Sequence, residues 1–133
     1  PSPKMASQFA KDELRMEPNA QPIFEPATFD AKKEITFKFH NLMRSRVYWQ
    51  LQSSNIDKFD VSESAGMLNP GQLTKPITMW RAPVAAGEDT SRDRVVLTFV
   101  DLPDGQLRTN LFSYFGERKT RTITIPLVYG EPK

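Results

Sequence analysis

Two short stretches of the chain, ITFKFH at residues 35–40 and VYWQLQ at residues 47–52, alternate apolar and polar side chains. A period of two over several residues is typical of a β-strand with one face buried and the other in solvent. Trp49 lies in phase with the apolar residues of the second stretch, so we expect it in the core. These two strands indicate a sheet protein whose function resides on its surface.

Further strands are predicted on both sides of this pair, because short apolar runs there are separated by turn residues. We expect seven strands in all, at residues 21–26, 34–40, 47–53, 59–61, 77–80, 94–100 and 122–128, with a turn at residues 66–71. The strand at 94–100 is apolar on both faces, which predicts a central position. The apolar residues Leu107, Leu111, Phe112 and Phe115 have helical spacing instead. The pattern favours an all-β, seven-stranded immunoglobulin-like sandwich with one short helix or helical turn.

Residues 1–19 mix Pro, Ser, Lys and Glu and predict a flexible N-terminal extension with at most a fraying helical turn. A docking arm that orders on a partner is the alternative. The folded domain is expected to span residues 20–133.

Composition excludes several classes of site. The 133 residues include no cysteine and one histidine, so disulfides, thiolate zinc sites and His-rich metal sites are not expected. No catalytic motif and no phosphate-binding glycine loop is found, so no enzyme, no cofactor and no catalytic residue is predicted. A net charge of +2 does not indicate a nucleic-acid partner. No apolar run is long enough to span a membrane, and a cytoplasmic protein is expected.

Several segments, taken in order, resemble the major sperm protein (MSP) domain family. They are NLMRSRVYWQLQSSN at 41–55, FDV at 59–61, GMLNPG at 66–71, GEDTSRDR at 87–94, PDG at 103–105, YF at 114–115 and IPLVY at 125–129. The resemblance covers roughly residues 20–132 with almost no gaps.

This resemblance implies an immunoglobulin-like sandwich without enzymatic activity. In nematode sperm, MSP forms dimers that assemble into filaments and drive amoeboid crawling without nucleotide. Related domains in membrane-tethered adaptors bind short acidic peptides that contain two phenylalanines. Two departures bear on this chain: Gln52 stands where both groups carry lysine, and SESA at 62–65 stands where MSP has a proline pair and a cysteine.

These departures favour a cytoskeletal protein that associates or co-assembles with MSP filaments in amoeboid sperm, with MSP or other MSP-domain proteins as partners and a possible homodimer. A soluble adaptor for acidic two-phenylalanine motifs and a released sperm signalling protein are the alternatives.

Two groups of residues are candidate contacts. Peptide binding by the adaptors implies a site here at Gln52, Ser53, Ser54, Arg92, Arg94 and Val96, and a solvated strand face is the plainer interpretation. Candidate assembly contacts are Tyr48, Trp80, Arg118, Lys119 and Arg121. The last three belong to a basic turn, for which simple solvation is again the alternative.

Overall fold

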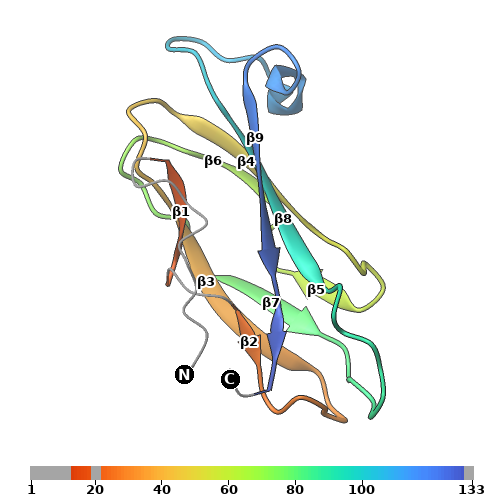
Figure 1. Cartoon of the computed structure of the whole chain (residues 1–133). Coiled ribbons are helices and arrows are strands. Elements are labelled where there is room, and N and C mark those ends of the chain that lie inside the picture. The colour runs from red at the N-terminus through yellow and green to blue at the C-terminus, as the bar shows by residue number, and fades with distance from the viewer. Residues whose placement is uncertain (1–12, 19–21, 131–133) are drawn as a thin grey trace.

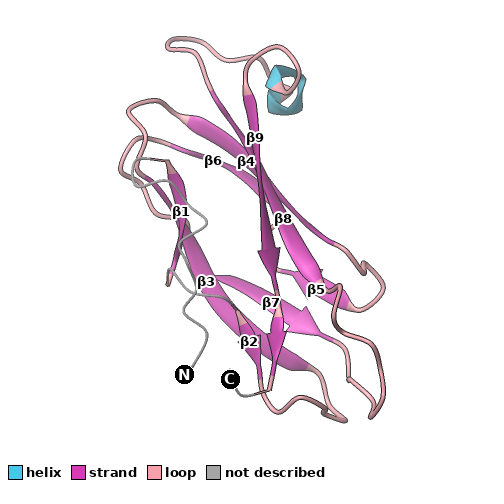
Figure 2. Cartoon of the chain, in the orientation of Figure 1, coloured by secondary structure: helices cyan, strands magenta, loops and turns pink. Residues whose placement is uncertain are grey.

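The computed structural model describes residues 13–18 and 22–130, and this part of the chain is built almost entirely of strands. The strands, drawn in Figures 1 and 2, are β1 (Leu14–Glu17), β2 (Ile23–Phe24), β3 (Lys33–Asn41), β4 (Val47–Ser53), β5 (Phe59–Val61), β6 (Ala65–Leu68), β7 (Ile77–Arg81), β8 (Arg94–Asp101), β9 (Thr120–Pro126) and β10 (Val128–Tyr129). A single 3₁₀ turn, η1 (Leu111–Tyr114), precedes β9. The all-β prediction is therefore confirmed.

Two four-stranded antiparallel sheets form the sandwich. Their strand orders are β1-β3-β7-β5 and β6-β4-β8-β9, and β2 with β10 adds a short parallel pair. In β4 the alternation runs as the sequence predicts, with Val47, Trp49 and Leu51 buried. β8 lies between β4 and β9, which confirms its predicted central position.

The core fills the space between the two sheets with aromatic and aliphatic side chains. Phe39 of β3 and Trp49 of β4 meet across the sandwich, with ring centroids 5.2 Å apart. Both are buried, as is Phe99 of β8. Aromatic pairs at this separation add to the stability gained from apolar burial, so this contact fixes the two sheets against each other.

The N-terminal strand corrects one expectation. Residues 14–17 were expected to belong to a flexible extension with at most a helical turn, but they form β1, which pairs with β3 from Leu14↔Asn41 to Glu17↔Lys38. Leu14 and Met16 are buried in the main core. The expected boundary at residue 20 therefore leaves out a strand of the sandwich, because a four-residue alternation is too short a sequence signal on its own. Residues 1–12 and 19 of the expected extension lie outside the described residues.

The number of strands also differs from the seven expected. β1 and β6 are additional, and the expected strand at 122–128 is divided into β9 and β10. β6 occupies part of the predicted turn at 66–71, since Met67 pairs with Tyr48 and Gly66 with Trp49. The turn itself follows, with Gly71 at φ +79°, a conformation that favours glycine.

The predicted helical turn is confirmed as η1, a single turn at one end of the sandwich (Figure 2). Asn110 caps it by accepting a hydrogen bond from the backbone N–H of Phe112. Tyr114 is buried in a second, smaller apolar cluster with Val100 and Leu102. This cluster anchors the turn to the end of β8.

Candidate functional site

The outer face of the β6-β4-β8-β9 sheet carries half of the predicted peptide-binding residues. Gln52 of β4 lies opposite Val96 of β8, and Val96 lies opposite Thr124 of β9. Arg94 is exposed and shares the outward phase of Val96 along β8. The structure thus brings Gln52, Arg94 and Val96 together on one face.

The predicted serines have other roles. The hydroxyl of Ser54 accepts a hydrogen bond from the backbone N–H of Arg94 at 3.1 Å and lies 3.3 Å from the backbone oxygen of Arg92, to which it donates. The Arg94 guanidinium also donates to that oxygen, at 3.0 Å. Ser54 therefore closes the turn that begins β8. Ser53 follows Gln52 in β4, so its side chain points to the opposite face of the sheet, and it lines a pocket there.

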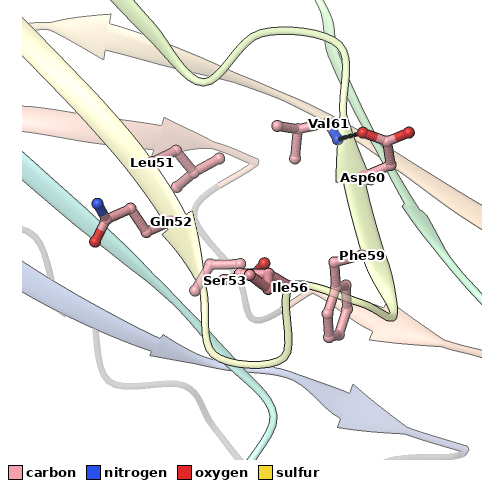
Figure 3. Close-up of a pocket in the computed structure, with 8 residues that line it drawn as sticks. Leu51, Gln52, Ser53, Ile56, Phe59, Asp60 and Val61 are labelled. Atoms are coloured by element: carbon pink, nitrogen blue, oxygen red, sulfur yellow. Dashed lines mark hydrogen bonds between the residues drawn. The ribbon is translucent and has the colours of Figure 1, made fainter.

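That pocket, with a volume of about 480 Å³, opens between β4 and β5. Figure 3 shows Leu51 and Gln52 on the β4 side and Phe59, Asp60 and Val61 on the β5 side. Ile56 comes from the connecting loop and is 76% exposed. The pocket is mainly apolar, with Asp60 as its one carboxylate, so its lining favours an apolar side chain over a charged ligand.

The two aromatic residues predicted as assembly contacts lie on different sheets. Tyr48 points outward from β4 and packs against Phe115, with ring centroids 5.4 Å apart. Trp80 points outward from β7, and the Lys32 ammonium lies 5.6 Å from the centroid of its ring. Tyr48 and Trp80 therefore do not form one patch.

The predicted basic turn is partly neutralised by carboxylates. Arg118 forms an ion pair with Asp101 at 2.7 Å and also donates to the backbone oxygen of Asp101. Arg121 forms an ion pair with Glu13. Among the described residues, Lys119 has no ion-pair partner, so it is the cation of this turn that remains available.

The structure contains a buried charged network that was not predicted from the sequence. Arg81, the last residue of β7, is fully buried and donates to Glu88 at 2.8 Å, to Asp93 at 3.2 Å and to the hydroxyl of Tyr129 at 3.0 Å. Tyr129 in turn donates to Asp93 at 2.7 Å. The signal was present in the sequence, because Arg81 continues the inward phase of Ile77 and Met79.

The network fixes the charge states of its members. Burial alone works against the charged form of Arg81, but hydrogen bonds to Glu88 and Tyr129 outweigh it and raise the pKa of the guanidinium. The hydrogen bond from Arg81 lowers the pKa of Glu88. Burial, and then the hydrogen bond to Asp93, raises the pKa of Tyr129. A neutral phenol thus bridges a cation and a carboxylate, and together they hold the loop that leads to Arg94.

Two other kinds of feature are absent from the described residues. The described residues contain no group of three or more His, Cys, Asp or Glu side chains placed to hold a metal ion. Within the same part of the chain, no helix has the length and apolar character needed to cross a bilayer.

Comparison with known proteins identifies the family. No protein-family model matches the sequence. Major sperm protein 10/36/56/76 of Caenorhabditis elegans is 25% identical over 127 residues, which cover 95% of this chain and 99% of that protein. Major sperm protein isoform alpha of Ascaris suum is 24% identical with the same coverage.

Solved structures share the fold. WR4, a C. elegans MSP family member, superposes with a TM-score of 0.67 at 14% identity and covers 89% of this chain and 98% of its own. SSP-19, an MSP-domain protein like family member of C. elegans, has a TM-score of 0.63 at 22% identity, with coverages of 86% and 97%. Sequence relatives along nearly the whole chain and the shared fold together show that this is an MSP-domain protein.

Proposed function

We propose that this chain is a non-enzymatic cytoskeletal protein of nematode sperm that associates or co-assembles with MSP filaments. The observation that carries the proposal is the near-complete correspondence between this chain and proteins named as major sperm proteins, which covers 95% of the chain and 99% of the relative. An inserted catalytic or ligand-binding segment would interrupt such a correspondence. Its partners are MSP or other MSP-domain proteins, and its location is the sperm cytoskeleton.

The outer face of the β6-β4-β8-β9 sheet supports this role physically. Its central rows pair Gln50 with Thr98 and Thr98 with Thr122, all uncharged. Removing uncharged side chains from water costs less free energy than removing charged ones. It is therefore suited to contact another protein.

Co-pelleting with assembled MSP filaments tests the proposal. The purified protein is titrated over a fixed amount of filament, and saturable pelleting is expected. A Thr98→Lys variant, with a charge in the centre of the outer face, is expected to pellet less, whereas Thr36→Lys on the other sheet serves as the matched control. A protein that stays in the supernatant at every concentration would exclude filament association.

The docking-arm alternative for the N-terminus is tested in the same assay. The truncation removes residues 1–12 only, because a longer one would delete β1 and expose the core around Leu14 and Met16. Lost pelleting by this truncated protein would assign the contact to the removed segment.

Binding of acidic linear motifs is the second candidate function. The observation that favours it is the grouping of Gln52, Arg94 and Val96 on one face, with Arg94 exposed and directed outward. An exposed guanidinium beside an apolar side chain suits a peptide that presents a carboxylate next to an aromatic ring. Gln52 weakens the site, because it supplies no charge.

The chain offers a direct test of this second function. Gln52→Lys is expected to raise the affinity for an acidic two-phenylalanine peptide by about 5- to 30-fold, which corresponds to about 1–2 kcal/mol for one added charge-assisted hydrogen bond. Arg94→Gln should lower it, and Thr36→Lys should leave it unchanged. Equal binding by all three variants, or no saturation by any, would exclude this site.

A further inference from the structure

We propose that the open edge of β9 is a strand-binding site, and that residues 1–12 of the same chain occupy it as an added antiparallel strand. These residues precede the described part of the chain. The contact is made within one chain, so it is independent of the proposed association with MSP filaments. Three observations carry the inference: a long unpaired strand edge, the place where the chain enters the described structure, and the composition of the segment.

The first observation is a long strand with one side unpaired. β9 is the last strand of the β6-β4-β8-β9 sheet, and among the described strands it pairs only with β8, along all seven of its residues. The other strands that end a sheet have three or four residues. Short length or outward-pointing charges normally keep an edge from pairing with another strand. β9 has neither, because the outward side chains of Thr120, Thr122 and Thr124 are uncharged.

The register shows which backbone groups of β9 face the open side. The N–H of Leu127 donates to the backbone oxygen of Asp93 at 3.1 Å, and these two residues continue the pairing of β8 with β9. In an antiparallel pair, residues that bond to the partner strand alternate with residues that do not. The two isoleucines of β9 therefore bond to β8. The N–H groups of Thr122 and Thr124 point away from β8, toward the open side.

The second observation is the place at which the chain enters the described structure. Glu13 forms an ion pair with Arg121 near the start of β9, and its backbone oxygen accepts a hydrogen bond from the N–H of Leu42 at 3.1 Å. Further along the chain, Ile23 pairs with Val128, beyond the end of β9. In Figure 1, β1 likewise lies above β2, and β9 runs downward toward the C-terminus. The chain after Glu13 therefore runs in the same direction as β9.

Residues that precede Glu13 thus begin beside the start of β9, and by turning back they lie antiparallel to it. Lys11 and Asp12 stand at the position of this turn, and Asp is common in turns. Asp12 also adjoins Glu13 in the sequence, as Lys119 lies close to Arg121. Since the described residues offer Lys119 no ion-pair partner, Asp12 supplies a carboxylate for it at the start of β9.

The third observation is the composition of residues 5–10, MASQFA, which contain no charge. In an extended strand Met5 and Phe9 point to the same face, because side chains alternate with a period of two. Ile123 is only partly buried and packs at the edge of the main core, so it offers apolar surface on the inner side of β9. Six extended residues span about 20 Å, and the five residues from Thr120 to Thr124 span about 17 Å. The segment is therefore long enough to cover the edge.

The added strand controls access to the edge. An open strand edge of this length pairs readily with an extended segment of another protein through main-chain hydrogen bonds. Residues 1–12 close the edge to such segments, and their release opens it. The N-terminal segment is thus a built-in competitor at a strand-binding site.

Amide hydrogen exchange, followed by NMR on the full chain, tests the proposal. The amides of Thr122 and Thr124 should exchange at least about tenfold more slowly in the parent protein than in a Ser7→Pro/Gln8→Pro double variant. Both positions are replaced because one of two neighbouring residues directs its N–H toward β9, and proline has no N–H to donate. Ser2→Pro, which lies outside residues 5–10, is the matched control and should leave the exchange unchanged.

Two further readouts identify the occupant. The amides of Ile123 and Ile125, which bond to β8, should stay protected in every variant and serve as the internal control. Nuclear Overhauser effects in the full chain should join residues 5–10 to Thr122 and Thr124, at all protein concentrations.

Three results would overturn the proposal. The first is rapid exchange of the Thr122 and Thr124 amides in the parent protein. The second is protection that the double variant retains. The third is protection that rises with protein concentration, which would assign the edge to a second copy of the chain.

Discussion

Replacement of Arg81 by methionine should destabilise the protein strongly, although Arg81 lies outside both candidate surfaces. Methionine retains the apolar stem of the side chain and removes the guanidinium. The hydrogen bonds to Glu88, Asp93, Tyr129 and the backbone oxygen of Ala82 are then lost together. Asp93, whose side chain is 7% exposed, remains as a buried carboxylate without a cation.

The size of the loss follows from that remaining charge. Breaking a buried ion pair by removing one partner costs about 3–5 kcal/mol. The carboxylate of Asp93 retains the hydrogen bond from Tyr129, which places the expected loss toward the lower end of that range. Total stabilities of single domains are about 5–15 kcal/mol, so the variant should lose a large part of its stability.

Urea denaturation measures this loss. The midpoint should fall while the slope with denaturant stays constant, because the same surface is exposed on unfolding. Arg94→Met, which removes an exposed arginine that begins β8, is the matched control and should change the free energy of unfolding by less than about 0.5 kcal/mol.

A double variant isolates the reason for the loss. Adding Asp93→Asn to Arg81→Met removes the unpaired charge, so the double variant should be more stable than the single one. A single variant that loses less than about 1 kcal/mol, or a double variant that is less stable still, would refute the buried-charge explanation.

Three further substitutions test other parts of the structure. Leu14→Ala should cost about 2–5 kcal/mol in urea denaturation if β1 belongs to the core, and a cost near zero would contradict that placement. Gly66→Ala should cost about 1–3 kcal/mol, because its Cβ would lie 3.1 Å from the indole nitrogen of Trp49, and an unchanged midpoint would show that the indole moves freely. Since the pKa of Tyr129 is raised above its ordinary value of about 10, its stabilising effect is complete below that pH and is lost above it. The parent should therefore lose stability more steeply above pH 10 than Tyr129→Phe does, and parallel pH profiles would argue against the raised pKa.

Much of the architecture was predictable because local signals were strong. β4 begins and ends at its predicted bounds, Val47 and Ser53, and β8 is central as its two apolar faces predict. The helical spacing near Phe115 marked η1, although the helix itself is confined to Leu111–Tyr114. Short elements were missed where turn residues or a polar context masked them, as with β1 and β6.

The candidate site was predictable only in part. Cross-strand register places Gln52 beside Val96, and two strands with known phase were enough to expect both on one face. That Ser54 closes a turn and Ser53 lines a pocket depends on the paths of the loops on both sides. The loop that carries Ile56 to that pocket has no periodic sequence signal.

The sequence by itself determined the alternation of the longer strands and the inward phase of Trp49, because these depend on residues near one another along the chain. The family resemblance was also in the sequence, as the order of short segments between residues 41 and 129. Only the tertiary structure decided which distant groups meet. It places Glu88, Asp93 and Tyr129 around Arg81, gives Arg118 and Arg121 carboxylate partners, and puts Tyr48 and Trp80 on opposite sheets. Such pairings join strands and loops that are distant in the sequence, and the side-chain alternation that defines each strand carries no information about which distant residue it will meet.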